Sequence, residues 1–160
     1  MNSDGFNPMR WDCSKQGCFN KLKRPKIEIF AECLPGRIAF TDVDAVVEIG
    51  GNLLELEWKC HREIAEGQAI KFRRATRTCH LTVIIVEGDA ETMAVDAIAV
   101  VSAGIIGPWC ETDIEGLKRK IAEWALWASA NYAPDLESYI NVKRFPASCT
   151  IEASGGTTWT

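Results

Sequence analysis

The sequence lacks the features that would take the protein into or across a membrane. It has no apolar run approaching the roughly 20 residues of a membrane-spanning helix, and its polar N-terminal segment contains no apolar stretch typical of a signal peptide. Hydrophobic residues make up 47% of the chain and charged residues 25%, which is typical of globular proteins. We therefore expect a cytoplasmic protein with no membrane partner.

The sequence also lacks the second ligand pair that a zinc site would need. Its seven cysteines are an odd number and are scattered, which without a secretion signal predicts reduced thiols. Cys13 and Cys18 have a spacing that could form half of a zinc site, but no second pair of cysteines or histidines completes it. Whether these two cysteines bind zinc stays open.

An excess of positive charge, the usual mark of a nonspecific nucleic-acid binder, is absent because the formal net charge is −4. The basic residues are nevertheless clustered. The three groups are Lys21, Lys23, Arg24 and Lys26; Lys71, Arg73, Arg74 and Arg77; and Lys118, Arg119 and Lys120. Such groups can bind phosphates even in an acidic protein, and each can equally be a solvated surface.

The sequence does contain a β-hairpin signal that gathers acids on one face between residues 40 and 59. Gly50-Gly51 predicts a two-residue turn, and side-chain alternation from that turn places Asp44 opposite Glu57. Opposed side chains have Cβ atoms about 5 Å apart, so the two carboxylates repel unless a cation lies between them. A three-residue loop would put them on different faces. The pattern therefore favours a divalent metal ion between Asp44 and Glu57.

Hydrophobic periodicity predicts a mixed order of helices and strands around this hairpin. We expect a short helix over 26–33, the hairpin over 37–59, a helix over 62–76, a strand buried on both faces over 79–88, a strand over 92–101 and a helix over 113–132. Gly104, Gly107 and Pro108 predict a loop. Thr112 with Glu115 fits a capping box for the last helix.

The expected fold class is α/β, with a small mixed β-sheet flanked by helices. Three segments are expected: an irregular N-terminal segment over 1–25, one α/β domain over 26–132, and a C-terminal extension over 133–160. The extension is rich in Gly, Ser and Thr at its end, a composition typical of disorder.

Asp44, followed after twelve residues by Glu57-Trp58-Lys59, resembles the core of the PD-(D/E)XK nuclease superfamily. The small Holliday-junction-resolvase and RecB-like members, many of them encoded by phages, are the most similar. The resemblance runs from about residue 26 to residue 88. It covers a helix carrying an acid, the Asp strand, the Glu-x-Lys strand, a helix with a polar residue and a buried strand. It implies a restriction-endonuclease-like core, although the proline of the family name is absent before Asp44.

The resemblance implies a metal site as well. Asp44 and Glu57 would bind a divalent metal ion, Mg²⁺ or Mn²⁺, and the carbonyl of Trp58 would add a ligand. Hard oxygen ligands of this kind suit Mg²⁺. The ion would lower the pKa of a bound water and hold the phosphate.

Further catalytic roles follow from the same resemblance. Lys59 would position the attacking water and offset developing charge. Glu32 or Glu28 on the preceding helix would complete the site, and the sequence does not choose between them. Gln68 would be the polar residue of the following helix. Asp42 and Glu55 are additional carboxylates, each of which could be a ligand, a partner of Lys59 or a surface residue.

The resemblance thus implies a metal-dependent nuclease that hydrolyses DNA phosphodiester bonds, with branched or structured DNA as one option. The alternatives are an inactive nuclease-fold protein that binds DNA or a protein partner, and a binding protein that presents a solvent-exposed acidic sheet face. The implied partner is nucleic acid, DNA before RNA, and a homodimer is compatible with the family. Cys60 beside His61 offers a Cys-His nucleophile by inventory, but neighbours on a strand point to opposite faces.

Overall fold

The computed structural model describes residues 33–34, 43–131 and 145–148. The chain divides into two compact units, residues 1–42 and 43–160, and the helices and strands given below all belong to the second. Outside the described residues lie Glu28, Glu32, Asp42, Cys13 and Cys18, the first basic group, and the expected boundaries after residues 25 and 132. The expectations that concern them stay predictions.

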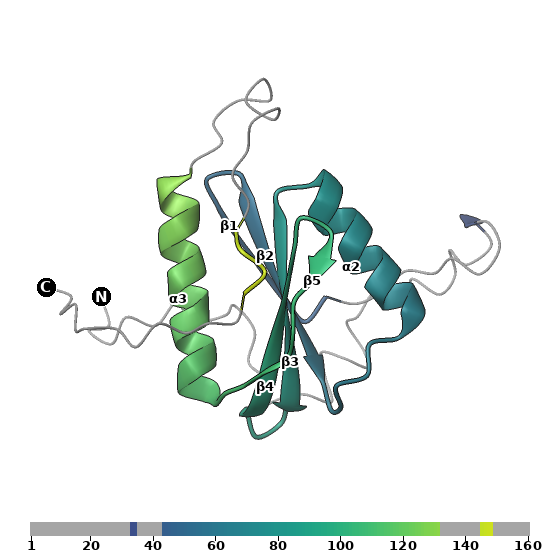
Figure 1. Ribbon diagram of the computed structural model, residues 1–160, viewed down its shortest axis with the longest axis vertical. Coiled ribbons are helices and arrows are strands. Elements are labelled where there is room, and N and C mark those ends of the chain that lie inside the picture. The colour runs from purple at the N-terminus through teal and green to yellow at the C-terminus, as the bar shows by residue number, and fades with distance from the viewer. Residues whose placement is uncertain (1–32, 35–42, 132–144, 149–160) are drawn as a thin grey trace, which may run out of the picture. The chain divides into compact units, whose positions relative to one another are not determined.

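The second unit has a mixed α/β fold in which a six-stranded, mostly antiparallel sheet lies between two helices (Figure 1). The strands are β1 (Ala45–Ile49), β2 (Asn52–Lys59), β3 (Leu81–Asp89), β4 (Ala94–Ser102), β5 (Ile105–Ile106) and β6 (Cys110–Glu111). The helices are α2 (Glu66–Thr78) and α3 (Ile114–Ala130). Neighbouring strands follow the order β1-β2-β3-β4, and both β5 and β6 pair with β4. From the hairpin onward, the predicted order of the longer elements is confirmed.

The hairpin of β1 and β2 has the predicted register. Ile49 pairs with Asn52, and Ala45 pairs with Leu56. Gly50 and Gly51 form the turn with φ angles of +58° and +85°, a region that glycine enters without the steric penalty of a Cβ atom. Extending the register by one residue brings position 44 opposite position 57.

β2 and β3 are parallel neighbours joined by α2, and this crossover decides what faces the acids of β2. Glu57 pairs with Ile85, and Lys59 pairs with Glu87. The interior of β3 is buried on both faces, as its β-branched run predicts. Because side chains alternate along the strand, Val83 and Ile85 pack in the cluster that contains Phe72 of α2. Ile84 and Val86 point the other way and pack in the cluster under α3. The face of β2 that carries Glu55, Glu57 and Lys59 is therefore covered by α2.

Two boundaries differ from the prediction. α2 begins at Glu66 rather than at residue 62, because Arg62 lies in the connection from β2 and its side chain is engaged by Glu87 and Glu111. The loop expected around Gly104, Gly107 and Pro108 contains two short strands, β5 and β6. Each has two residues, which is too short for a periodic pattern in the sequence.

α3 forms as predicted, with Leu117, Trp124 and Ala128 buried along one stripe. Its capping residue is Asp113 rather than Thr112, because the helix starts one residue later than a Thr112 cap requires. The Asp113 side chain accepts a 2.8 Å hydrogen bond from the backbone N–H of Gly116, which satisfies one of the free donors of the first turn. Neither α2 nor α3 is long and apolar enough to cross a membrane.

Lys120 departs from the basic surface group to which its sequence assigns it. Its side chain is 0% exposed, and its ammonium lies 3.0 Å from Glu123 Oε2. The same ammonium lies 5.1 Å from the centre of the Phe145 ring. Lys120 is thus an internal residue that links α3 to the segment 145–148.

Candidate functional site

Glu57 is the centre of a polar cluster on the α2 side of the sheet. Its side chain is 10% exposed, and its Oε1 lies 2.8 Å from Lys59 Nζ. Gln68 Nε2, from the first turn of α2, donates a 2.8 Å hydrogen bond to the same oxygen. A carboxylate with so little exposure needs such partners, because an unpaired buried charge is costly. The structure therefore brings together three of the residues proposed from the sequence.

Asp44 reaches the main chain of the same motif from the beginning of the hairpin. Its Oδ2 accepts a 2.6 Å hydrogen bond from the backbone N–H of Trp58, the residue between Glu57 and Lys59. Asp44 itself is exposed. Its carboxylate is thus fixed beside the Glu-x-Lys segment and remains open to solvent.

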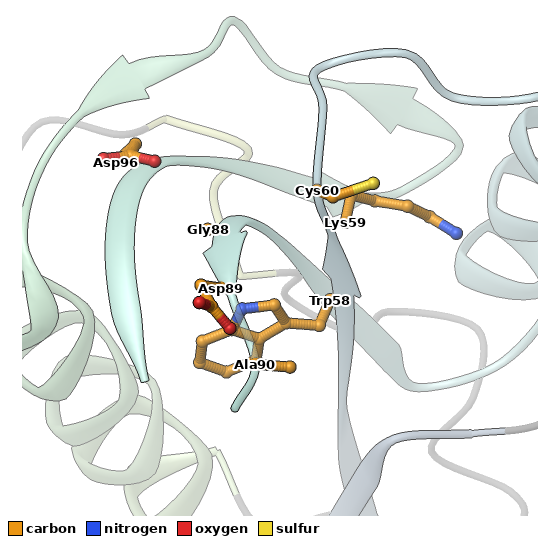
Figure 2. A pocket seen from close by; sticks show the side chains of 7 residues that line it. All are labelled: Trp58, Lys59, Cys60, Gly88, Asp89, Ala90 and Asp96. Carbon is orange, nitrogen blue, oxygen red and sulfur yellow. The ribbon is translucent and has the colours of Figure 1, made fainter. Parts of the chain in front are cut away.

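The Trp58 side chain lies on the other face of the sheet. Figure 2 shows the side chains of Trp58 and Lys59 leaving β2 in opposite directions. The indole packs against the apolar cluster under α3. A pocket of about 450 Å³ on this side is lined by Trp58, Lys59, Cys60, Gly88, Asp89, Ala90 and Asp96. Any contribution of Trp58 to the Glu57 cluster must therefore come from its backbone, as the resemblance implies.

A second pocket, of about 250 Å³, lies next to the cluster. It is lined by Lys59, Cys60, His61, Glu63, Ala65 and Gln68. Cys60 and His61 both follow Lys59, the last residue of β2. The argument from strand alternation therefore does not apply to this pair. Their position directly after the Glu-x-Lys segment is the sequence signal that pointed to this place.

Three carboxylates around the cluster, Glu55, Glu87 and Glu111, are paired with cations. Glu55 Oε1 lies 3.0 Å from Lys71 Nζ of α2. Arg62 Nε lies 2.6 Å from Glu87 Oε2, and Arg62 Nη2 lies 2.5 Å from Glu111 Oε1. The hydrogen bond to Glu87, followed by that to Glu111, raises the pKa of the Arg62 guanidinium above its ordinary value. Lys71 and Arg62 thus fix the surroundings of the cluster.

The donor set of the cluster fits a hard divalent ion. Asp44 Oδ1 and Glu57 Oε2 make no hydrogen bond or ion pair within the described part of the chain. No group of three or more His, Cys, Asp or Glu residues that could hold a metal occurs among the described residues. Mg²⁺ is often bound by only one or two carboxylates, with waters and substrate phosphate completing its shell. The Asp44 and Glu57 carboxylates and the Trp58 carbonyl are oxygen donors of the kind that such a site would use.

Comparisons with protein-family models, curated proteins and solved structures find no match for this chain. A functional assignment therefore depends on the chemistry of the Glu57 cluster and on the sequence resemblance.

Proposed function

We propose that the protein is a metal-dependent nuclease that hydrolyses DNA phosphodiester bonds at the Glu57 cluster. The observation that carries this proposal is the convergence on one carboxylate oxygen. Lys59 Nζ and Gln68 Nε2 each lie 2.8 Å from Glu57 Oε1, which leaves Glu57 Oε2 available. A structural ion pair needs one cation, whereas this carboxylate is also held in orientation by an amide from a different element.

The order of elements supports the proposal. A hairpin carries Asp44 at its start and Glu57 and Lys59 at its end, α2 supplies Gln68, and β3 returns parallel to β2. This is the order that the resemblance to PD-(D/E)XK nucleases implies between the Asp strand and the buried strand. We therefore include a restriction-endonuclease-like core in the proposal.

The residues would divide the chemistry as follows. Asp44, Glu57 and the Trp58 carbonyl would hold Mg²⁺ or Mn²⁺, which supplies charge neutralisation and lowers the pKa of water. The Lys59 ammonium provides a fixed positive charge for the phosphoryl oxygens as negative charge develops on them. Gln68 keeps the Glu57 carboxylate in one orientation through its amide. Such preorganisation matters because small misplacements of a catalytic group reduce rates strongly.

An inactive protein that offers a solvent-exposed acidic face is less compatible with the structure. The side chains of Glu55 and Glu57 are 8% and 10% exposed, and α2 covers the face of β2 from which they project. These two carboxylates therefore contribute little to an exposed acidic surface. An inactive nuclease fold that binds nucleic acid remains the second candidate, because the arginines of α2 described below favour nucleic-acid binding.

The test is cleavage of plasmid and of short labelled DNA with Mg²⁺ or Mn²⁺. We expect Glu57→Gln and Lys59→Ala to lower the rate by about 100-fold or more, as loss of a charge-stabilising group does in other enzymes. Glu55→Gln is the matched control, because Glu55 is an equally buried carboxylate on the same strand that pairs with Lys71 instead. It should cleave within a few-fold of wild type.

Two results would count against the proposal. Equal cleavage by wild type, Glu57→Gln and Lys59→Ala would exclude catalysis at this cluster. DNA binding by a well-folded wild type that never cleaves would favour the inactive nuclease fold. Circular dichroism and thermal unfolding of each variant separate lost chemistry from lost folding.

A further inference from the structure

Unpaired positive charge in the described part of the chain is concentrated on α2. Of its nine lysines and arginines, five lie within ion-pair distance of a carboxylate, namely Lys59, Arg62, Lys71, Lys118 and Lys120. The four without such a partner are Arg73, Arg74, Arg77 and Arg119. Three of these four belong to α2. The sequence groups basic residues by proximity, whereas the structure shows which charges remain available.

Arg73, Arg74 and Arg77 share the outer side of the helix, and we call them the arginine face. All three are exposed, whereas Phe72 and Thr76 on the inner side are buried. Positions three and four apart are neighbours on a helix surface. Glu66 is the one carboxylate of α2, and it precedes Arg73 by seven residues, or about 10 Å along the helix axis. The arginine face is therefore free of neutralising acids on its own helix.

The backbone that carries the arginine face is supported by the turn between β4 and β5. Gly104 N–H donates a 3.1 Å hydrogen bond to Thr76 Oγ1. A methyl group on Gly104 would come within 3.3 Å of both the Arg73 carbonyl oxygen and Arg77 Cβ. The glycine thus permits close packing of this turn on the helix. A rigid base lowers the entropy lost when the guanidinium groups bind an anion.

We propose that the arginine face binds the phosphate backbone of an unpaired nucleic-acid strand that extends from the Glu57 cluster. The proposal rests on the proposed function for the identity of the ligand. Guanidinium groups bind phosphate oxygens in pairs of parallel hydrogen bonds. Because the formal net charge of the protein is −4, a phosphate chain is attracted to this local patch rather than to the protein as a whole.

The position of the arginine face predicts how far the contacts extend. Gln68 belongs to the first turn of α2 and contacts Glu57. The arginines follow five to nine positions later, which is about 8–14 Å along the helix axis. The contacted phosphates would therefore belong to neighbouring nucleotides of the strand and not to the bond that is cut.

Gln68 and the arginine face lie on different sides of α2, and this arrangement favours one form of nucleic acid, single-stranded or duplex, over the other. Gln68 faces the sheet, whereas the arginine face is turned outward. A helix with its side chains is about 10–12 Å across, and the persistence length of duplex DNA is about 50 nm. A duplex cannot bend around so narrow an object, whereas a single strand can. The geometry therefore favours a single-stranded segment along α2.

The test is binding of a labelled single-stranded oligonucleotide, measured by fluorescence anisotropy without metal in the Glu57→Gln background. We expect the triple variant Arg73→Gln, Arg74→Gln, Arg77→Gln to bind at least about 10-fold more weakly. Each phosphate contact contributes about 0.7 to the slope of log K against log salt for single strands, so that slope should fall by about 2. Arg119→Gln, on α3, removes the fourth unpaired arginine of the described residues and should leave affinity and slope unchanged.

Several outcomes would overturn this inference. They are undiminished binding by the triple variant, an equal loss with Arg119→Gln, tighter binding of a duplex of the same length, or equal competition by polyglutamate, which would indicate an acidic protein partner. All four arginines are exposed, so thermal unfolding should be unchanged. Because neither metal nor hydrolysis is involved, the result is independent of whether the Glu57 cluster cleaves DNA.

Discussion

Gln68 and Glu57 are joined by a 2.8 Å hydrogen bond between α2 and β2. The amide and Lys59 share the same carboxylate oxygen, so the charge of Glu57 is balanced from one side only. This relationship has a direct consequence for substitutions at position 68.

Gln68→Glu should destabilise the protein at neutral pH, because it sets a second carboxylate against Glu57. Like charges at this distance raise the pKa of one of the pair. Above that raised pKa both carboxylates are charged and repel each other. The repulsion is relieved as the pH falls through the raised pKa toward the ordinary carboxyl pKa of about 4. Urea unfolding at pH 7 and pH 5 measures the effect, which should shrink at the lower pH. Gln68→Ala loses one hydrogen bond, about 1 kcal/mol, and should follow the pH dependence of wild type.

Phe72→Ala should cost about 3–5 kcal/mol of unfolding free energy, because it empties the centre of the cluster between α2 and the sheet. Phe72 is fully buried there beside Val83 and Ile85. Ile70→Ala on the same helix is the control, since Ile70 is 41% exposed, and surface substitutions usually change stability by less than about 0.5 kcal/mol. Chemical denaturation of both variants checks the prediction. Similar losses in the two would mean that α2 does not pack by its Phe72 side.

Gly88→Ala should be strongly destabilising, while Gly67→Ala should be neutral or stabilising. A Cβ atom on Gly88 would lie 2.0 Å from the Ala94 carbonyl oxygen, at the irregularity between β3 and β4. Nothing lies within 4 Å of a Cβ on Gly67, and alanine in a helix is favoured over glycine by about 1 kcal/mol. The thermal unfolding temperature should therefore fall for Gly88→Ala and be unchanged or higher for Gly67→Ala. A tolerated Gly88→Ala would contradict the close approach of the two strands.

Glu123→Ala should destabilise the protein more than Lys120→Met. Removing the acid leaves the buried Lys120 ammonium with the Phe145 ring as its one remaining contact of those given by the described residues. Loss of one partner of a buried pair costs about 3–5 kcal/mol, and because Glu123 is 47% exposed we expect about 1–3 kcal/mol here. Methionine preserves the apolar stem and removes the charge, so Lys120→Met should change stability by less than about 1 kcal/mol. The reverse order in chemical denaturation would show that the ammonium itself stabilises α3.

Asp89→Ala should destabilise the protein at neutral pH by an amount that declines in acid. The backbone N–H groups of Glu91 and then Thr92 hydrogen-bond the carboxylate and lower the pKa of Asp89 below its ordinary value. A lowered pKa in the folded state contributes stability above the unfolded pKa and loses it as the pH falls through the folded pKa. The difference between wild type and variant should therefore be constant from neutral pH to about pH 5 and shrink below about pH 4. A difference that grows in acid would refute this assignment.

The hairpin and its register follow from local signals, which is why they are predictable. Gly50-Gly51 and the alternation on either side lie within twenty residues, and no distant contact is needed to set them. The same holds for the β-branched run of β3 and for the apolar stripe of α3. Gln68 is a candidate site residue only through the resemblance, and its contact with Glu57 has no local signal because it depends on how α2 docks.

Tertiary pairing explains what the sequence did not reveal. Lys71 binds Glu55, and Arg62 joins Glu87 to Glu111, through elements whose relative positions no local pattern encodes. Lys120 lies three residues after Leu117 and four before Trp124, on the edge of the apolar stripe. The charge of Lys120 predicts a surface position, whereas its place on the helix puts its side chain inside the protein.

The parallel pairing of β2 with β3 also orders the assembly of the molecule. The β1–β2 hairpin can close early because its strands are adjacent in the chain, whereas β3 can join β2 only after α2 has spanned the distance between them. A nascent chain that has formed the hairpin alone already carries Asp44, Glu57 and Lys59, but Gln68 is still absent from Glu57. The polar surroundings of that carboxylate are thus complete only once α2 has joined the hairpin.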